Sequence, residues 1–377
     1  MKAVTYQGAQ KIEVKAVLDP QIQDPEDVII KVTSTAICGS DLHLYLGDFP
    51  LPKGYIIGHE PMGIVEEVGS EVTNVQKGDR VVVPFTVACG RCPYCHQHLE
   101  SQCDHSNPHY DSGGLFGYSE KFGDYPGGQA EYLRVPFGNY TPFKIPQNCE
   151  LEDEELLFLS DVLPTAYWSV ENAGVKAGDT VIVLGSGPVG LMTQKFAWQK
   201  GAERVIVVDY INYRLEFSKK INRTETFDFT KDPDIGETLK EITHGGADVV
   251  IDCVGMDGKK SPLEFIEQKL KLQGGTLGPI QIATKAVRKC GTVQITGVYG
   301  GLYNMFPLGP FFVRNVTLKT GQAPARGYMP KLYQMITEHK IDPTAIITHR
   351  LPLQDAAKAY DLFHNKKEDC IKVVLKP

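Results

Sequence analysis

Residues 180–199 constrain the fold of this chain more than any other segment. A mostly apolar run, 180–184, is followed directly by a glycine-rich turn and by a segment expected to be helical, 189–199. The turn matches G-x-G-x-x-G, in which glycines allow a tight turn, backbone approach to a pyrophosphate and close packing of helix on strand. A phosphate would then lie at the unpaired N–H groups of the helix N-terminus. The predicted dinucleotide-binding residues are Gly185, Gly187, Pro188, Val189 and Gly190.

Short apolar segments alternate with helical segments after this turn. The runs 204–208, 248–253 and 291–295 are expected to be strands, and 214–221 is expected to be a helix. Apolar strands separated by helices are typical of a parallel sheet that helices cover on both faces. The middle of the chain is therefore predicted to be a doubly wound α/β domain of the Rossmann type.

A carboxylate stands where the adenosine ribose of a dinucleotide would bind. Asp209 follows the second strand, nineteen residues after Gly190. It could accept hydrogen bonds from both ribose hydroxyls and would repel a 2′-phosphate, which favours NAD over NADP. Arg214, five residues further on, could lie along the adenine or weaken that preference.

The first 150 residues have a different pattern, rich in turns and in β-branched residues. Strands are expected at 28–32, 63–68 and 80–83. The pattern changes at about residue 152, where a helix is expected over 152–170 with a break or kink at Pro164. The first part of the chain is therefore predicted to be β-rich.

One connection in the second half is unusually long. The 37 residues 254–290 lie between two predicted strands and exceed what one crossover helix requires. We expect a helix over 261–272, then an inserted loop around residues 274–275, and then another helix. Towards the C-terminus the pattern becomes β and loop again, with a helix over 331–339 and a final strand over 371–375.

Four of the nine cysteines lie within fifteen residues, with the spacing C-x2-C-x2-C-x7-C. In a protein that is not secreted, clustered thiols more often hold metal than form disulfides. Four thiolates complete the coordination of a structural zinc ion, so this loop is expected to support the fold rather than perform chemistry. Iron–sulfur clusters use the same ligands, and the spacing leaves that alternative open. The residues are Cys89, Cys92, Cys95 and Cys103.

Length and charge limit the classes of partner. A chain of 377 residues is too long for one ordinary core and suits two domains. The formal net charge is −7, and there is no basic block to bind nucleic acid or an anionic membrane. There is also no run of eighteen apolar residues and no apolar signal region at the start. We expect a cytoplasmic protein that acts on a small molecule.

Cys38 and His59 indicate a second metal site. Cys38 lies in the sequence CGSDLH and His59 in GHE, and each alone would more often be a packed core residue. Together with the four-cysteine loop and the glycine-rich turn, in this order, they resemble the zinc-dependent medium-chain alcohol dehydrogenase family over nearly the full length. The resemblance implies a GroES-like, β-rich catalytic domain over 1–155 and 311–377. It also implies an NAD-binding Rossmann domain over 156–310.

The resemblance implies three protein ligands on a catalytic zinc, of which the third is unusual here. Cys38 and His59 match the first two ligands. Most members have cysteine at the third position, whereas this chain has Asp161 there, and Cys149 lies twelve residues too early. Without the other ligands, Asp161 would be interpreted as a helix-surface carboxylate. Aspartate and the long 254–290 segment resemble the subgroup that includes glutathione-independent formaldehyde dehydrogenase and formaldehyde dismutase.

Further roles follow from the resemblance. Ser40 would hydrogen-bond the substrate oxygen, and His43 would pass its proton through the cofactor ribose to solvent. Asp41 would orient His59. Glu60 would lie near the zinc, as a temporary ligand or as a hydrogen-bond partner. The residues implied to contact the nicotinamide are Thr165, Gly297 and Val298.

The predicted activity is an NAD-dependent oxidation or reduction. Zinc would act as a Lewis acid on a small alcohol or hydrated aldehyde, with formaldehyde as one candidate, and hydride would pass to NAD. An aspartate as the third ligand predicts a somewhat more electrophilic zinc than a thiolate in that position. The alternatives are a polyol or secondary-alcohol dehydrogenase, a glutathione-dependent enzyme, a dismutase and a non-catalytic NAD-binding protein. By position, Phe49, Phe85 and Phe116 are expected to line the substrate pocket, and the resemblance implies a homotetramer.

Overall fold

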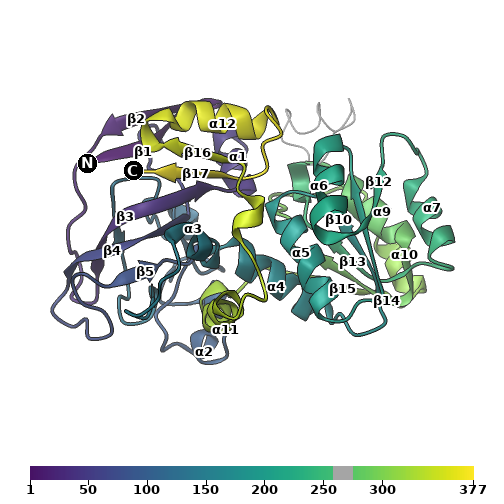
Figure 1. The fold of residues 1–377 in the computed structure, drawn as a ribbon, viewed down its shortest axis with the longest axis horizontal. Helices are drawn as coiled ribbons and strands as arrows, with labels where there is room; N and C mark the ends of the chain where they lie inside the picture. Colours follow the sequence, from purple (N-terminus) through teal and green to yellow (C-terminus); the bar gives the residue numbers. More distant parts are fainter. Residues whose placement is uncertain (258–274) are drawn as a thin grey trace. The chain divides into compact units, whose positions relative to one another are not determined.

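The computed structural model of the chain describes residues 1–257 and 275–377. The helix predicted over 261–272 lies outside the described residues. Within the described part, strands and helices are distributed between two compact units (Figure 1). No helix of this part combines the length and the apolar character needed to cross a bilayer.

Unit 1 is formed by two separate segments of the chain and unit 2 by one continuous segment. Unit 1 contains Met1–Pro164 and Ala323–Pro377, so both ends of the chain contribute to it. Unit 2 contains Thr165–Gln322. Both boundaries lie later in the chain than the sequence analysis places them, and helix α4 (Val162–Ala173) begins just before the first boundary.

Unit 1 is built around a mostly antiparallel sheet of seven strands. The order is β16-β17-β3-β4-β5-β9, and β8 also pairs with β3; β1 with β2 and β6 with β7 form two small sheets. The central strand β3 is buried along most of its length, as its β-branched composition predicts. The strands of unit 1 are β1 (Lys2–Gly8), β2 (Lys11–Ala16), β3 (Val28–Ile37), β4 (Glu60–Val68), β5 (Arg80–Val82), β6 (Thr86–Val87), β7 (Gly114–Leu115), β8 (Tyr132–Val135), β9 (Phe143–Lys144), β16 (His349–Pro352) and β17 (Val373–Lys376).

Short helices cover parts of this sheet. Two buried apolar clusters form its core: one contains Ile30, Val65 and Phe116, and the other joins Ile37 to Tyr360 of the C-terminal helix. The C-terminal segment therefore packs into the same core as the N-terminal strands. The helices of unit 1 are α1 (Gly39–Leu46), α2 (Pro93–His96), α3 (Asp153–Leu156), α11 (Ala325–Thr337), α12 (Ala356–His364) and the 3-10 turns η1 (Glu100–Gln102), η2 (Glu120–Phe122), η3 (Leu157–Ser160), η5 (Thr344–Ile346) and η6 (Leu353–Asp355).

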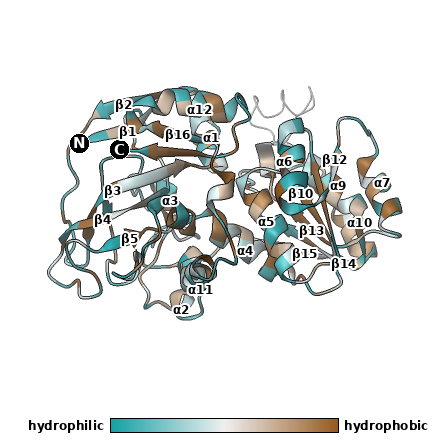
Figure 2. Cartoon of the chain, in the orientation of Figure 1, coloured by the Kyte–Doolittle hydropathy of each residue, from teal (hydrophilic) through white to brown (hydrophobic). Residues whose placement is uncertain are grey.

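Unit 2 is a parallel sheet of six strands in the order β12-β11-β10-β13-β14-β15. Val181 to Leu184 are buried on both sides of the sheet, because helices cover both faces. Figure 2 shows the strands of this sheet as mainly hydrophobic. The predicted doubly wound α/β fold is confirmed. The strands are β10 (Thr180–Leu184), β11 (Arg204–Asp209), β12 (Glu225–Asp228), β13 (Ala247–Asp252), β14 (Val287–Ile295) and β15 (Thr317–Thr320). The helices are α5 (Pro188–Gln199), α6 (Asn212–Asn222), α7 (Ile235–Ile242), α9 (Gly278–Ala286), α10 (Leu308–Val313) and the turn η4 (Gly255–Asp257).

Two helix predictions require correction. The helix expected over 152–170 breaks before Pro164, between η3 and α4. Pro164 instead lies in the first turn of α4, where a backbone N–H has no intrahelical acceptor to lose. The helix expected over 331–339 begins earlier, at Ala325, and includes Pro330 in its interior.

Candidate functional site

The four cysteines of the predicted metal loop lie together in unit 1. Their Sγ atoms are all within 4.8 Å of one another, and all four side chains are buried. The sulfurs of Cys92 and Cys103 are 3.9 Å apart, and those of Cys89 and Cys95 are 4.0 Å apart. None of the four forms a disulfide. Four convergent sulfurs suit a tetrahedral zinc ion and leave no coordination position for a substrate.

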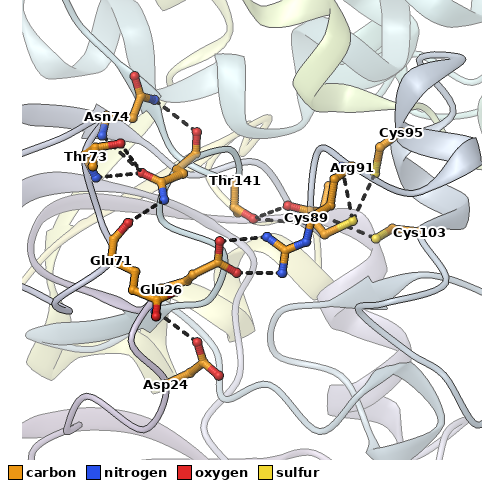
Figure 3. Close-up of polar contacts among 12 residues, drawn as sticks. Asp24, Glu26, Glu71, Thr73, Asn74, Cys89, Arg91, Cys95, Cys103 and Thr141 are labelled. Carbon is orange, nitrogen blue, oxygen red and sulfur yellow. Dashed lines mark hydrogen bonds and ion pairs between the residues drawn. The ribbon is translucent and has the colours of Figure 1, made fainter.

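Polar contacts hold this loop in place (Figure 3). The Arg91 N–H donates to Cys89 Sγ at 3.4 Å, and the Arg91 guanidinium makes two hydrogen bonds of 2.7 Å to Glu26. On the other side, the Thr141 hydroxyl donates to the carbonyl of Ala88 at 2.9 Å and accepts from its N–H at 3.2 Å. These hydrogen bonds hold the loop at its first cysteine.

A second set of buried donors meets elsewhere in unit 1. Ligand atoms of Cys38, His59, Glu60 and Asp161 lie within 4.8 Å of one another. Asp161 Oδ2 is 3.2 Å from Cys38 Sγ and 3.2 Å from His59 Nε2. Asp161 occupies the non-helical break between η3 and α4 and is only 6% exposed, so it does not lie on a helix surface. A thiol, an imidazole and a carboxylate form a donor set that suits zinc.

Local backbone geometry directs these side chains. Cys38 is the N-cap of α1, and Asp41 completes a capping box by accepting the Cys38 N–H at 2.9 Å. The turn before His59 contains Gly58 with a φ of +96°, where an added Cβ would lie 2.3 Å from the side chain of Gln129. Only glycine fits both the left-handed backbone and this contact.

Charges around the donors determine where protons reside. The pKa of Cys38 is raised to about 11, first by burial and then by the carboxylates of Asp161 and Glu60. Burial opposes the charged form of His59, but Asp41 and Asp161 hold its pKa well above the ordinary value. Asp41 Oδ1 lies 3.0 Å from His59 Nδ1, which directs Nε2 towards Cys38 and Asp161. A metal ion bound there would have to displace protons.

A buried lysine, which the sequence analysis missed, pairs with Glu60. Lys372 Nζ lies 2.6 Å from each carboxylate oxygen of Glu60, and both side chains are fully buried. Burial alone would lower the pKa of Lys372, but Glu60 and Cys38 raise it above the ordinary value. Burial raises the pKa of Glu60, and Lys372 opposes that rise. The signal in the sequence was a lysine inside the apolar run 371–375.

Aromatic rings surround the donors. Ser40 Oγ lies 3.3 Å from His59 Nε2, and the Tyr118 hydroxyl forms a hydrogen bond with Ser40. The rings of Tyr118 and Phe85 lie 5.8 and 6.2 Å from the imidazole of His59. The expected pocket residue Phe116 is instead fully buried in the apolar core of unit 1, in the cluster that contains Ile30 and Val65. Tyr118, two residues later, is the aromatic residue that faces the donors.

His43 lies on the same helix as Ser40 and is buried. Its Nδ1 is 3.4 Å from Asp48 Oδ2, and its ring packs edge-on against Phe49 at 6.0 Å. Asp48 could not be predicted from the sequence, because a carboxylate five residues from a histidine matches no motif. This pair gives His43 an acceptor for a proton on Nδ1.

The glycine-rich turn of unit 2 has the geometry that its pattern predicts. Gly185 has a φ of +91°, and a Cβ on Gly190 would lie 2.1 Å from the carbonyl oxygen of Gly185. Helix α5 begins at Pro188, with Gly187 as its N-cap. Val189 follows in the first turn, where N–H groups have no intrahelical acceptors. The turn therefore brings bare backbone N–H groups to a helix N-terminus, as a pyrophosphate site requires.

Asp209 and Arg214 lie beside this turn. Asp209 Oδ2 accepts the Ser186 N–H at 2.7 Å, and its Oδ1 accepts the N–H groups of Tyr210 and Ile211 at 2.6 and 3.0 Å. The position of a Cβ on Gly187 lies 3.6 Å from Arg214 Nη1. The carboxylate of Asp209, at the end of β11, therefore stabilises the glycine-rich turn through its hydrogen bond with Ser186.

The residues expected near a nicotinamide make ordinary backbone contacts within unit 2. Thr165 lies in α4, and its carbonyl accepts the hydroxyl of Ser169 at 2.6 Å. Gly297 could carry no Cβ, because that atom would lie 2.1 Å from the nitrogen of Gly255. The carbonyl of Val298 accepts the N–H of Met256 at 2.9 Å. The Val298 carbonyl is therefore already used inside unit 2.

Comparison with known proteins places the chain in a family. Residues 24–147 match the model of the alcohol dehydrogenase GroES-like domain, and residues 188–269 match that of the zinc-binding dehydrogenases. A zinc-type alcohol dehydrogenase-like protein, AdhB, of Bacillus subtilis is 60% identical over the full length of both chains. The chain belongs to the zinc-type, medium-chain alcohol dehydrogenase family.

Two further relatives refine this assignment. The glutathione-independent formaldehyde dehydrogenase of Pseudomonas aeruginosa is 34% identical over 96% of this chain and 94% of its own. The solved structure of alcohol dehydrogenase TADH from a Thermus species is 34% identical and superposes with a TM-score of 0.85 over 100% of this chain and 99% of its own. The protein is a zinc-binding oxidoreductase of the alcohol dehydrogenase type, with two groups of side chains that could hold zinc. A similar solved structure, a zinc-binding dehydrogenase of Sinorhizobium meliloti, is 26% identical over 100% of this chain and 99% of its own, has a TM-score of 0.78 and contains NADP.

Proposed function

We propose that this enzyme transfers hydride between NAD and a small alcohol or hydrated aldehyde, with formaldehyde as the first substrate to test. The observation that carries the proposal is the buried set of Cys38, His59 and Asp161, in which an aspartate stands at the third ligand position, where most members of the family have cysteine. The similarity to a formaldehyde dehydrogenase of Pseudomonas aeruginosa supports the choice of substrate.

The same three side chains would hold the catalytic zinc, and the four-cysteine loop would hold a structural one. Zinc bound by two anionic ligands and an imidazole supplies Lewis acidity to a substrate oxygen. Ser40, whose Oγ lies 3.3 Å from His59 Nε2, would hydrogen-bond that oxygen. His43 can hold a proton at Nδ1 against Asp48. The rings of Phe85 and Tyr118 lie 6.2 and 5.8 Å from the imidazole of His59, so a substrate bound there would lie beside aromatic side chains.

Formaldehyde labelled with carbon-13 gives the direct test. The zinc-loaded protein is incubated with the substrate and NAD, without any thiol, and the products are followed by NMR. Formate with an equal amount of NADH would support the proposal, whereas equal formate and methanol would indicate a dismutase that retains its cofactor. No product would contradict both formaldehyde functions. A panel of polyols and secondary alcohols then separates those dehydrogenases from a non-catalytic NAD-binding protein.

The cofactor preference is a second part of the proposal. Asp209 would bind the adenosine ribose of NAD and disfavour the 2′-phosphate of NADP. Replacing Asp209 by Asn should reduce the ratio of kcat/KM for NAD to that for NADP by about tenfold, since a hydrogen bond to a charged group is worth about 1.5–3 kcal/mol. Asp228→Asn is a matched control, because Asp228 pairs with Asp209 in register on the neighbouring strand β12. An equal change in both variants would contradict the assignment.

The proposal also includes assembly in the cytoplasm as a homotetramer. Unit 2 carries several strongly exposed apolar side chains around α10, which are candidates for a subunit contact. These residues are Leu302, Met305, Leu308, Phe312 and Val313. Sedimentation velocity would give the mass in solution, and a monomer at micromolar concentration would contradict this part of the proposal.

A further inference from the structure

A chain of buried polar side chains leads from His59 to the C-terminal helix α12. Tyr360 and Gln129 are both fully buried. The Tyr360 hydroxyl donates to Gln129 Oε1 at 2.9 Å, and Gln129 Nε2 donates to Asp41 Oδ2 at 3.2 Å. Asp41 Oδ1 in turn lies 3.0 Å from His59 Nδ1. Three elements distant in sequence are thereby connected behind one imidazole.

Three hydrogen bonds fix the orientation of the Gln129 amide. Besides Asp41, its Nε2 donates to the carbonyl of Ala36 at 3.1 Å, while its Oε1 accepts from Tyr360. A flipped amide would place its oxygen against a carboxylate and a carbonyl, neither of which can donate. The network is therefore directional, and its acceptor end is the carboxylate that faces His59.

The carboxylate of Asp41 is held from two sides. Its Oδ2 accepts from the Cys38 N–H and from Gln129, which leaves Oδ1 for the imidazole. Gln129 also packs against the turn before His59, where a Cβ on Gly58 would lie 2.3 Å from it. Loss of the Gln129 side chain would remove one of the two bonds on Oδ2 and open space behind the turn.

We propose that Gln129 and Tyr360 are positioning residues of the metal site, which act through Asp41 on the ring of His59. The inference deepens the proposed function, because it assumes that His59 Nε2 is a zinc ligand. Groups behind a metal-bound histidine fix its tautomer and ring orientation, and their loss typically weakens metal binding about 10–100-fold.

The test measures metal binding rather than turnover. Zinc dissociation constants are measured for the full-length protein by chelator competition, and the Co²⁺ form is examined by absorption spectroscopy. Gln129→Leu should weaken zinc binding at the site of Cys38, His59 and Asp161, the mixed site, about 10–100-fold and change the Co²⁺ ligand-field bands. Tyr360→Phe keeps the ring and removes only the hydroxyl. It should weaken zinc binding at the same site about fivefold, which is the effect of one hydrogen bond. The four-cysteine site serves as an internal reference and should keep its affinity.

Gln194→Leu is the matched control. Gln194 is likewise fully buried, and its Oε1 accepts from Asn222 at 2.9 Å inside unit 2. If Gln129→Leu and Tyr360→Phe alter the affinity and the Co²⁺ spectrum no more than this control, the positioning role is wrong. If Gln129→Leu does not fold, Tyr360→Phe decides alone. A wild-type protein that binds two zinc ions but oxidises no alcohol or aldehyde would contradict the proposed function and leave this inference standing.

Discussion

The two buried clusters of metal-binding side chains in unit 1 are built in opposite ways. The four-cysteine loop takes identical ligands from fifteen consecutive residues. The mixed cluster, which is Cys38, His59, Glu60 and Asp161, takes unlike ligands from three separate segments. The mixed cluster has a fully buried ion pair, between Glu60 and Lys372, whereas the Arg91–Glu26 pair beside the four-cysteine loop leaves Arg91 exposed. This difference suggests a division of roles, in which one cluster stabilises the fold and the other supplies an adjustable environment for chemistry. Variants of the two clusters should therefore fail in different ways.

Loss of a ligand from the four-cysteine loop should have the largest effect on folding. In Cys103→Ser, the closed site loses a thiolate, and the free energy of unfolding should fall by more than about 4 kcal/mol because structural zinc contributes directly to folding. Cys290→Ser, at an exposed cysteine, is the control and should change stability by less than about 0.5 kcal/mol. Chemical denaturation with zinc analysis measures both. Equal stability of the two variants would contradict a structural role.

Loss of the Glu60–Lys372 ion pair should have the next largest effect on the free energy of unfolding. Lys372→Met leaves the carboxylate of Glu60 buried without a cation, which should cost about 3–5 kcal/mol of stability. Lys376→Met removes a lysine from the same strand, β17. The Lys376 side chain is 42% exposed and pairs with Glu154 at 3.4 Å, so its loss should lower the free energy of unfolding by at most about 1 kcal/mol.

A double variant sharpens this comparison. Adding Glu60→Gln to Lys372→Met removes the unpaired charge, so much of the lost stability should return. Failure of the second change to restore stability would show that Lys372 acts through packing against Phe158, whose ring lies 5.5 Å from its Nζ. Denaturant unfolding of the two single variants and the double variant completes the cycle.

Asp161→Ala should separate chemistry from folding. The variant should keep its stability within about 1–2 kcal/mol but bind one zinc ion instead of two. Its kcat/KM should fall by more than about 100-fold, because loss of even an indirect partner of a metal typically costs about 10–100-fold. Asp361→Ala, at an exposed aspartate paired with Lys367, controls for the loss of a surface carboxylate. A variant that keeps two zinc ions and full activity would exclude Asp161 as a ligand.

The contrast between the clusters also explains what could be predicted from the sequence. The four-cysteine loop and the glycine-rich turn are local, so their spacing alone indicated their chemistry. Asp161 was found only through family resemblance, because its role depends on a helix break that brings it to Cys38 and His59. Lys372, Tyr118 and Gln129 were missed, since their contacts form only when distant elements pack. The break before Pro164 was misplaced for the same reason.

Protonation provides the last distinction. At neutral pH the Cys38 thiol, with a pKa raised to about 11, and the His59 imidazole, with a pKa held well above its usual value, both carry protons that zinc must displace. Zinc affinity of the mixed site should therefore rise with pH, by about tenfold per pH unit for each proton released. Asp41→Asn removes the largest cause of the raised His59 pKa, so the variant should release one proton fewer. Calorimetry in buffers of different ionisation enthalpy counts these protons, with the four-cysteine site as the unchanged reference. An equal proton count in wild type and Asp41→Asn would show that His59 is already neutral before zinc binds.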